Sequence, residues 1–294
     1  MKKIITGTVL TLVVNLVLSP VLMGQPVDEL INSYSGQAEW DAAAGKVTFT
    51  SAGIVTFENK GTPKQHFWIV PPDVKIITIN ADVQVTCAFH TQADCTIRGM
   101  NRMTSVVYGT DIRKWAQTNG VKAFRHCQFQ NLGGTMTVKN LTSLNPFGFH
   151  VRGGGNLVMV SNCDFLDRRG GSGNHSDGIE GGDGSVIENC YFETGDDVIK
   201  VYHNLTVRNC TINMVQNAVP IQLGWGNTGD DTADFHNLVI YGDSGRGNDD
   251  NAIIVGRLGT YTKTINIHGC KVENPNASWI SLREKDMRVI GEVS

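Results

Sequence analysis

Short runs of apolar and β-branched residues recur along the chain, and each run ends at Gly, Asn or Asp. One set of runs reads MTVKNLTS, LVMVSNCDF, SVIENCYF, LTVRNCTI, LVIYGDSG and INIHGCKV. The aligned positions in this set are Asn140, Asn162, Asn189, Asn209, Gly242 and Gly269. Repetition at unequal spacings of this size predicts a solenoid whose turns differ in length.

A second short run follows in each unit: FGFHV, DGIEG, DVIKV, VPIQL, AIIVG and WISL. Helical periodicity is almost absent after the N-terminal apolar stretch, and the two-residue turns typical of hairpins are scarce. We therefore predict an all-β, single-domain, right-handed parallel β-helix over residues 68–294. Residues 25–67 are predicted to form a short N-terminal cap or first irregular turn.

The N-terminus combines Lys2 and Lys3 with an apolar stretch from Ile4 to Leu22, which is typical of a secretory signal. We predict a signal peptide over residues 1–24 and a secreted or periplasmic protein with no membrane association after cleavage. Because the small residues around the expected cleavage site are imperfect, a retained anchor is the alternative. No second apolar run reaches membrane-spanning length.

Charge and cysteine content restrict the classes of partner. A formal charge of -3 over 294 residues, with scattered Lys and Arg, argues against nucleic-acid binding. We expect a monomer. Of the seven cysteines, five occupy similar contexts (FRHCQF, VSNCDF, IENCYF, VRNCTI and IHGCKV), which favours buried stacked thiols over disulfides. Only Cys87 and Cys95 suggest a local pair.

Three carboxylates stand out in the segment HSDGIEGGDGSVIENCYFETGDDVIKVYHN. Asp177 precedes the run at Ile179, whereas Asp196 and Asp197 precede VIKV in the next unit, so we predict all three at one edge of one sheet. Aligned residues of successive turns lie roughly 4.8 Å apart. Negative charges this close raise the pKa of one of the carboxyl groups, which then keeps its proton near neutral pH. An acid beside ionised carboxylates suits glycosidic cleavage, with inversion if the carboxyl groups stand roughly 6.5 to 9.5 Å apart.

Neighbouring polar and aromatic residues suit a sugar-binding groove. Lys200 and Tyr202 alternate on VIKVY, Gln222 and Trp225 belong to the next turn, and His175 flanks the cluster. We predict these five as substrate contacts. The structural alternatives are a solvated turn for the Asp pair, a hydrogen-bonded neighbour for His175 and core packing for Trp225.

The motifs SDGIE, DDVIKVY and PIQLGW resemble family 49 of the glycoside hydrolases, the dextranases and isopullulanases of the pectin-lyase-like superfamily. The resemblance covers about His175 to Gly226 and implies a right-handed parallel β-helix that hydrolyses an α-glucan such as dextran with inversion. It makes Asp196 the general acid, with Asp177 and Asp197 positioning and activating water. It implies no metal and no cofactor.

Other enzymes and binding proteins remain as alternatives. Polygalacturonases share a similar arrangement of acids, but their GHG and RIK motifs are missing here, which disfavours a uronate polymer without excluding a sulfated one. A polysaccharide lyase would use the acids to bind calcium and Lys200 as the base. A non-catalytic carbohydrate-binding β-helix would use the carboxylates only in turns.

Overall fold

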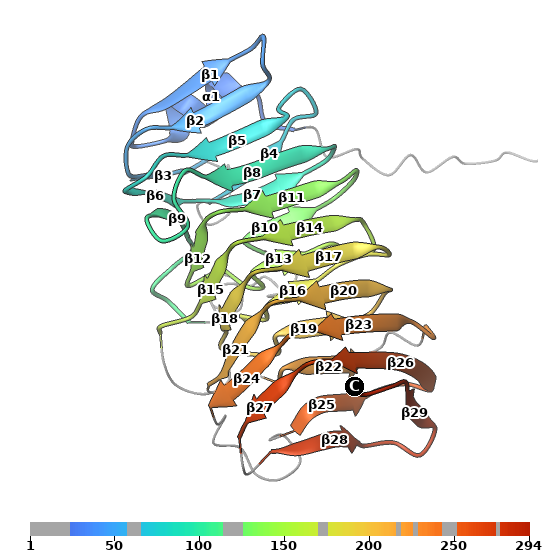
Figure 1. The fold of residues 1–294 in the computed structure, drawn as a ribbon. Helices are drawn as coiled ribbons and strands as arrows, with labels where there is room; N and C mark the ends of the chain where they lie inside the picture. The colour runs from blue at the N-terminus through green and yellow to red at the C-terminus, as the bar shows by residue number, and fades with distance from the viewer. Residues whose placement is uncertain are drawn as a thin grey trace, which may run out of the picture.

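The computed structural model describes residues 24–57, 66–113, 126–169, 176–215, 219–225, 229–242, 252–274 and 277–294. The chain winds through three sheets in a fixed order, so that each turn adds one strand to each sheet (Figure 1). Strands of successive turns pair in parallel, as in Val151 with Ile179 and Ile179 with Ile199. The protein is a parallel β-helix, as the sequence predicts.

We call the eleven-stranded sheet A and the two nine-stranded sheets B and C. Sheet A contains β1 (Ala38–Asp41), β2 (Lys46–Phe49), β5 (Ile76–Ile79), β8 (Cys95–Gly99), β11 (Met136–Lys139), β14 (Val158–Ser161), β17 (Ser185–Glu188), β20 (Leu205–Arg208), β23 (Thr232–His236), β26 (Tyr261–His268) and β29 (Met287–Ile290).

Sheet B contains β4 (Phe67–Val70), β7 (Ala88–Thr91), β10 (Phe129–Asn131), β13 (Val151–Arg152), β16 (Ile179–Glu180), β19 (Ile199–Val201), β22 (Ile221–Gly224), β25 (Ala252–Arg257) and β28 (Ser278–Leu282). Sheet C contains β3 (Gly53–Ile54), β6 (Val83–Thr86), β9 (Ser105–Tyr108), β12 (Thr142–Leu144), β15 (Asp164–Leu166), β18 (Tyr191–Glu193), β21 (Thr211–Met214), β24 (Val239–Gly242) and β27 (Lys271–Glu273).

The N-terminal end of the coil is covered by helix α1 (Val27–Ser33) and by β1, which pairs antiparallel with β2. Strand β2 in turn pairs in parallel with β5, and β3 pairs in parallel with β6. The segment predicted as a cap, residues 25–67, therefore holds both the cap and the first strands of the coil. The predicted signal segment, residues 1–24, lies outside the described residues except for Gly24.

The core follows from the two-residue alternation of each strand. In β14 and β17, buried residues alternate with half-buried ones, and the buried side chains point into the coil. Aromatic rings stack between successive turns, as Phe165 does on Phe192 with ring centroids 5.1 Å apart. Repeated apolar positions thus become a continuous column along the coil.

The corner between sheets A and C requires a left-handed backbone, and Asn tolerates this conformation better than most residues. Positive φ angles of 53° to 57° occur at Asn140, Asn162, Asn189, Asn209 and Asn237. The sequence alignment that puts Gly242 at this corner is wrong, because that glycine ends β24. The true corner residue is Asn237, and the apolar run that follows it belongs to β24.

The cysteines that follow these corners pack as predicted. Cys163, Cys190 and Cys210 are buried and Cys270 is half-buried, whereas Cys127, predicted to belong to the same set, is buried before β10 of sheet B. All seven cysteines are free thiols. The suggested pair of Cys87 with Cys95 is wrong: both thiols are free and buried. Burial raises the pKa of Cys95 to about 12, so this thiol stays protonated near neutral pH.

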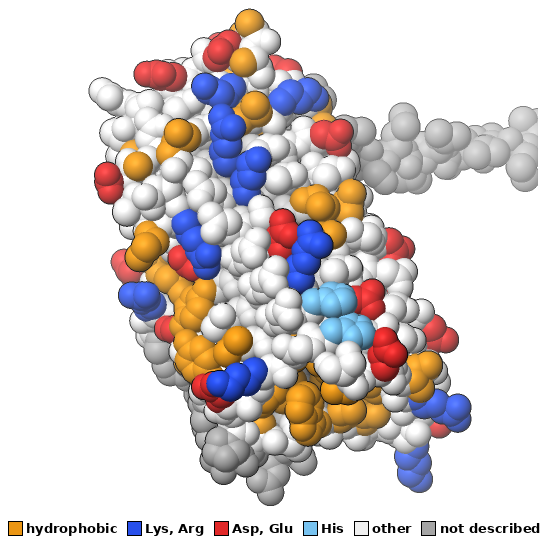
Figure 2. Space-filling model, in the orientation of Figure 1, with side chains coloured by type: hydrophobic (Ala, Val, Ile, Leu, Met, Phe, Trp, Pro, Cys, Tyr) orange, Lys and Arg blue, Asp and Glu red, His pale blue; other side chains and the backbone are white. Residues whose placement is uncertain are grey.

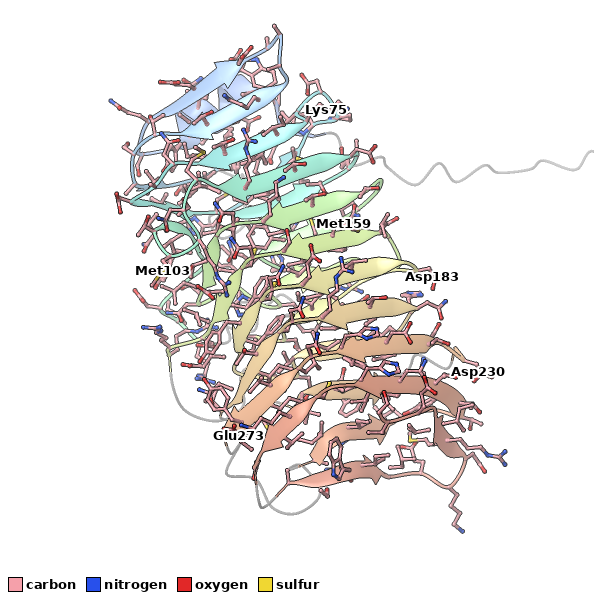
Figure 3. All side chains as sticks on the ribbon, viewed as in Figure 1. Lys75, Met103, Met159, Asp183, Asp230 and Glu273 are labelled. Atoms are coloured by element: carbon pink, nitrogen blue, oxygen red, sulfur yellow. The ribbon has the colours of Figure 1, made fainter. Side chains whose placement is uncertain are left out.

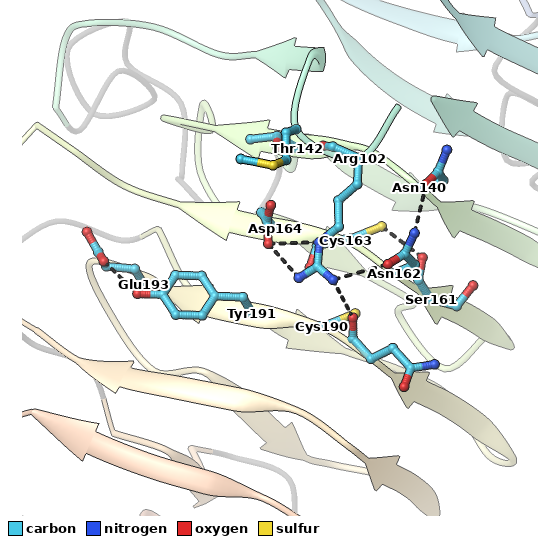
Figure 4. Close-up of polar contacts among 12 residues, drawn as sticks. Arg102, Asn140, Thr142, Ser161, Asn162, Cys163, Asp164, Cys190, Tyr191 and Glu193 are labelled. Atoms are coloured by element: carbon cyan, nitrogen blue, oxygen red, sulfur yellow. Dashed lines mark hydrogen bonds and ion pairs between the residues drawn. The ribbon is translucent and has the colours of Figure 1, made fainter. Parts of the chain in front are cut away.

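Arg102, in the loop between β8 and β9, joins several turns at the corner (Figure 4). Its guanidinium donates to Asp164 Oδ1 at 2.6 Å, to Asn162 Oδ1 at 3.1 Å and to the Asn189 carbonyl at 3.0 Å. One side chain therefore links corner residues of two successive turns with the acid that begins β15.

The outer face of sheet A carries charges of both signs (Figure 2). Lys and Arg gather near its N-terminal strands, where Arg98 and Lys139 are in register, and His236 stacks on His268 further along with centroids 4.8 Å apart. Asp183 and Asp230 lie on the edge where the chain passes from sheet B to sheet A (Figure 3). Among the described residues, no helix has the length and apolar character needed to cross a membrane.

Candidate active site

The three carboxylates predicted to cluster do so at the entrance to two neighbouring strands of sheet B. Asp177 lies two residues before β16, while Asp196 and Asp197 precede β19. The amide of Gly178 donates to the Asp197 carbonyl at 2.8 Å, which sets the two turns in register. One oxygen from each of the three carboxylates lies within 4.8 Å of the others. The residues are only 4%, 9% and 7% exposed, respectively.

Gly178 permits this close approach. A Cβ built on it would lie 2.2 Å from the carbonyl oxygen of Val198, which is too close for any side chain. The SDG motif therefore has a steric reason for its glycine, because a larger residue would push the Asp177 turn away from the Asp197 turn.

Lys200 provides the positive charge of the cluster. It lies on β19 and faces the same side as Glu180 and Gln222, with which it is in register. Its Nζ lies 2.5 Å from Asp177 Oδ1 and 3.6 Å from Asp197 Oδ2, and the side chain is almost fully buried. One ammonium group therefore bridges the acids of two turns.

Gln222 orients the groups around it from the following turn, on β22. Its Oε1 accepts hydrogen bonds from Lys200 Nζ at 2.6 Å and from Tyr202 Oη at 2.8 Å, while its Nε2 donates to Asp197 Oδ2. Because the two donors fix which end of the amide is the oxygen, the NH₂ must face the carboxylate. The structure thus brings together Lys200, Tyr202 and Gln222 as predicted.

Burial dominates the electrostatics of the cluster. It raises the pKa of Asp197 to about 7, against the opposing effect of Lys200, and it raises the pKa of Asp177 well above its usual value. Burial alone would lower the pKa of Lys200, but the adjacent Asp177 and Asp197 raise it overall. Near neutral pH, the cluster therefore combines a protonated lysine with carboxyl groups that share at least one proton.

The carboxylates lie close together, with one oxygen from each of Asp177, Asp196 and Asp197 within 4.8 Å of the others. The roughly 6.5 to 9.5 Å expected for an inverting hydrolase separates whole carboxyl groups. A distance between single oxygens does not test that expectation, so inversion stays a prediction. The compact arrangement favours proton sharing among the acids.

Trp225 lies beyond the cluster, at the end of β22. Its backbone is left-handed, with φ of 54°, and the Arg257 guanidinium lies 4.9 Å from the centroid of its ring. The ring also packs against Val219, Ala252 and Val255. Trp225 is therefore part of a local apolar cluster and a cation–π pair. The predicted contact His175 lies outside the described residues.

Sequence reasoning missed a polar group next to the acid-bearing turns: Asp167, Arg169 and Ser176. Asp167 is 1% exposed and follows β15, and its carboxylate binds Arg169 and Ser176. The register of Leu166 with Glu193 puts Asp167 opposite Thr194 in the next turn. Aligning CDFLDRR with CYFETGDD would have identified this buried polar position.

Within the part of the chain that the structure describes, two groups could offer oxygen or nitrogen ligands to a metal ion. The first is the carboxylate cluster itself, where Lys200 already supplies a positive charge. The second comprises Asp183, His203 and Asp231 on the edge between sheets B and A. There, Asp183 accepts hydrogen bonds from Asn204 at 2.9 and 2.8 Å, and Asp231 pairs with Lys263.

The fold and this cluster define a parallel β-helix with a buried acidic site. No family model and no characterised protein sequence matches the chain. Among solved structures, Dex49A from Penicillium minioluteum is similar, with a TM-score of 0.62 and 16% sequence identity over 85% of this chain. The likeness establishes the β-helical fold. The match covers 47% of Dex49A, so this chain spans about half of its length.

Proposed function

We propose that the protein is a glycoside hydrolase that cleaves a polysaccharide, with Asp177, Asp196 and Asp197 as its catalytic residues. The observation that carries the proposal is a cluster of three buried carboxylates, with one oxygen of each within 4.8 Å of the others, in which Lys200 contacts Asp177 and Asp197. Such a site holds both a proton to donate and carboxylates to activate water. The motifs that resemble family 49, together with a fold similar to that of Dex49A, support an α-glucan such as dextran as the substrate.

The roles follow the contacts of Lys200. Asp177 and Asp197 both lie beside its ammonium group, so we assign them as the pair that positions and activates water. Asp196 is the proposed general acid, which protonates the leaving glycosidic oxygen. Tyr202 and Gln222 would hold sugar hydroxyls at the same face, and no metal or other cofactor takes part. Proton NMR of the first product would show whether the anomeric centre inverts.

Lys200 also bears on the lyase alternative. A lyase base must be neutral to abstract a proton, whereas the two adjacent carboxylates raise the pKa of Lys200 and stabilise its charged form. The position of the ammonium group against Asp177 and Asp197 therefore supports an electrostatic role rather than proton abstraction.

The test is the release of reducing ends from dextran, pullulan, polygalacturonate and carrageenan, with and without a chelator. We expect release from an α-glucan that resists the chelator, and a loss of about 10² to 10⁴ in turnover for Asp196→Asn. Asp183→Asn, which changes a carboxylate on the edge between sheets B and A, is the matched control and should retain parental turnover. Equal rates for Asp196→Asn and the parent would contradict the proposal, and binding without cleavage would indicate a carbohydrate-binding role.

We also propose that the protein is exported through the signal at residues 1–24 and acts as a secreted or periplasmic monomer. N-terminal sequencing of the exported protein checks the first statement, since cleavage near residue 24 would leave a new N-terminus. Light scattering at the concentrations used for the assay checks the second.

A further inference from the structure

A buried ion pair between Asp167 and Arg169 lies on the Asp177 turn, after β15. Asp167 Oδ1 accepts hydrogen bonds from the amide and the Nε of Arg169, both at 3.0 Å, and Asp167 Oδ2 accepts one from Arg169 Nη2 at 2.9 Å. The side chains of Asp167 and Arg169 are 0% and 5% exposed. Although burial opposes ionisation, Arg169 and Ser176 lower the pKa of Asp167 to about 2. Asp167 is therefore a permanently ionised acceptor.

Ser176 connects this ion pair to the second turn. Its hydroxyl donates to Asp167 Oδ2 at 2.5 Å and accepts a hydrogen bond from the amide of Gly195 at 3.0 Å. An ionised carboxylate can only accept, so it forces the hydroxyl hydrogen of Ser176 towards itself. The lone pairs of the hydroxyl are then left to accept the Gly195 amide.

Ser176 and Gly195 each stand next to a predicted catalytic acid in the chain. Ser176 immediately precedes Asp177, and Gly195 immediately precedes Asp196. One hydroxyl therefore ties together the backbones of both acid-bearing turns at the residues that enter them. Thr194 closes the second turn by donating its hydroxyl hydrogen to the Asp196 carbonyl at 2.6 Å.

We propose that Asp167 and Ser176 are positioning residues that fix the Asp196 turn against the Asp177 turn, and so hold the acid in reach of the water-activating pair. Neither residue is assigned a contact with substrate. The inference rests on the proposed function for its catalytic meaning. Its structural part, that the Ser176 hydroxyl holds the Gly195 amide in place, can be measured without any substrate.

The Ser176 hydroxyl keeps its direction only while residue 167 accepts its hydrogen bond. In Asp167→Asn, the new amide can present NH₂ instead of an acceptor, which lets the hydroxyl turn and leaves the Gly195 amide without its fixed partner. Ser176→Ala removes the same hydrogen bond without touching the ion pair. The two variants should therefore share one defect although they remove different groups.

The experiment compares both variants with Asp164→Asn. This matched control breaks a different Asp–Arg pair, between Asp164 and Arg102 at the corner between sheets A and C. Hydrogen exchange at residues 194–197 and steady-state kinetics are measured for each. We expect exchange at Gly195 to accelerate about tenfold or more in Asp167→Asn and Ser176→Ala, as the loss of one hydrogen bond would give. Turnover should fall about 10²-fold with little change in KM. Asp164→Asn should change neither the exchange at Gly195 nor the turnover.

Two results overturn the inference. Unchanged exchange at Gly195 in Ser176→Ala would show that the hydroxyl does not hold the turn, whether or not the parent is active. Parental kcat in folded Ser176→Ala with accelerated exchange would show that the order of the turn has no catalytic role. If the parent cleaves nothing, the proposed hydrolase function fails by itself, and exchange alone decides whether Asp167 and Ser176 fix the turn.

Discussion

The raised pKa of Asp197 predicts an unusual pH dependence of folding. Burial raises this pKa from 3.8 to about 7 in the folded protein. The folded state then binds more protons than the unfolded state between these values, so the free energy of unfolding falls as the pH rises. The stabilising contribution of protonated Asp197 is fully present below about pH 4 and is lost as the pH rises to about 7.

The size of the effect follows from the shift. About three pKa units at 1.36 kcal/mol each give at most about 4 kcal/mol, and the sharing of protons with Asp177 makes the measured value smaller. Asp197→Asn cannot ionise but still offers an oxygen to Gln222. Its free energy of unfolding should therefore lack this pH-dependent loss.

Urea unfolding of the parent and of Asp197→Asn between about pH 4 and pH 8 tests the reasoning. We expect the two curves to diverge as the pH rises, with the variant the more stable at the alkaline end. Asp183→Asn is the control, because the pKa of that exposed carboxyl is lowered and it titrates below this range. Parallel pH profiles for the parent and Asp197→Asn would refute the claim that burial of Asp197 governs the cluster.

Three further substitutions test the packing around the site. Lys200→Met leaves buried carboxylates without their cation and should cost about 3 to 5 kcal/mol in urea unfolding, part of which Asp177→Asn should restore in the double variant. Gly178→Ala places a Cβ 2.2 Å from the Val198 carbonyl oxygen, so thermal melting should show a lower midpoint and the Asp177 turn should lose hydrogen-exchange protection. Phe192→Ala removes a ring from the core stack and should destabilise the coil by about 3 to 5 kcal/mol in urea unfolding, while Leu in its place should cost much less.

Much of this fold is visible in the sequence because each turn repeats a local demand. A left-handed corner requires Asn or Gly, and strands whose inner face is buried require alternating apolar residues. Each requirement involves residues close together in the chain, so it appears as a repeating pattern in the sequence. The alignment fails at Gly242, where the apolar run LVIY belongs to β24 and the corner residue, Asn237, stands before that run.

The clustering of the three acids was also predictable, because parallel register converts a sequence repeat into spatial adjacency. The bond from Lys200 to Asp177 and the direction of Gln222 were not, since side-chain conformations decide them. Asp167 escaped notice for a different reason. It follows β15 of sheet C, and Ser176 precedes β16 of sheet B, so their contact is made outside both strands, which no single-strand pattern encodes.

The site combines residues that oppose folding with residues that support it, and the sign of a stability change should separate them. Asp197 is buried next to other acids, so neutralising it should stabilise the fold while impairing catalysis, as expected when active-site groups are strained. Asp167 is buried in a matched pair with Arg169, so neutralising it should destabilise the fold by about 3 to 5 kcal/mol while also slowing turnover. Two Asp→Asn changes only one turn apart in the same coil should thus have opposite effects on stability and the same effect on rate. That combination distinguishes acids that perform the chemistry from an acid that positions them.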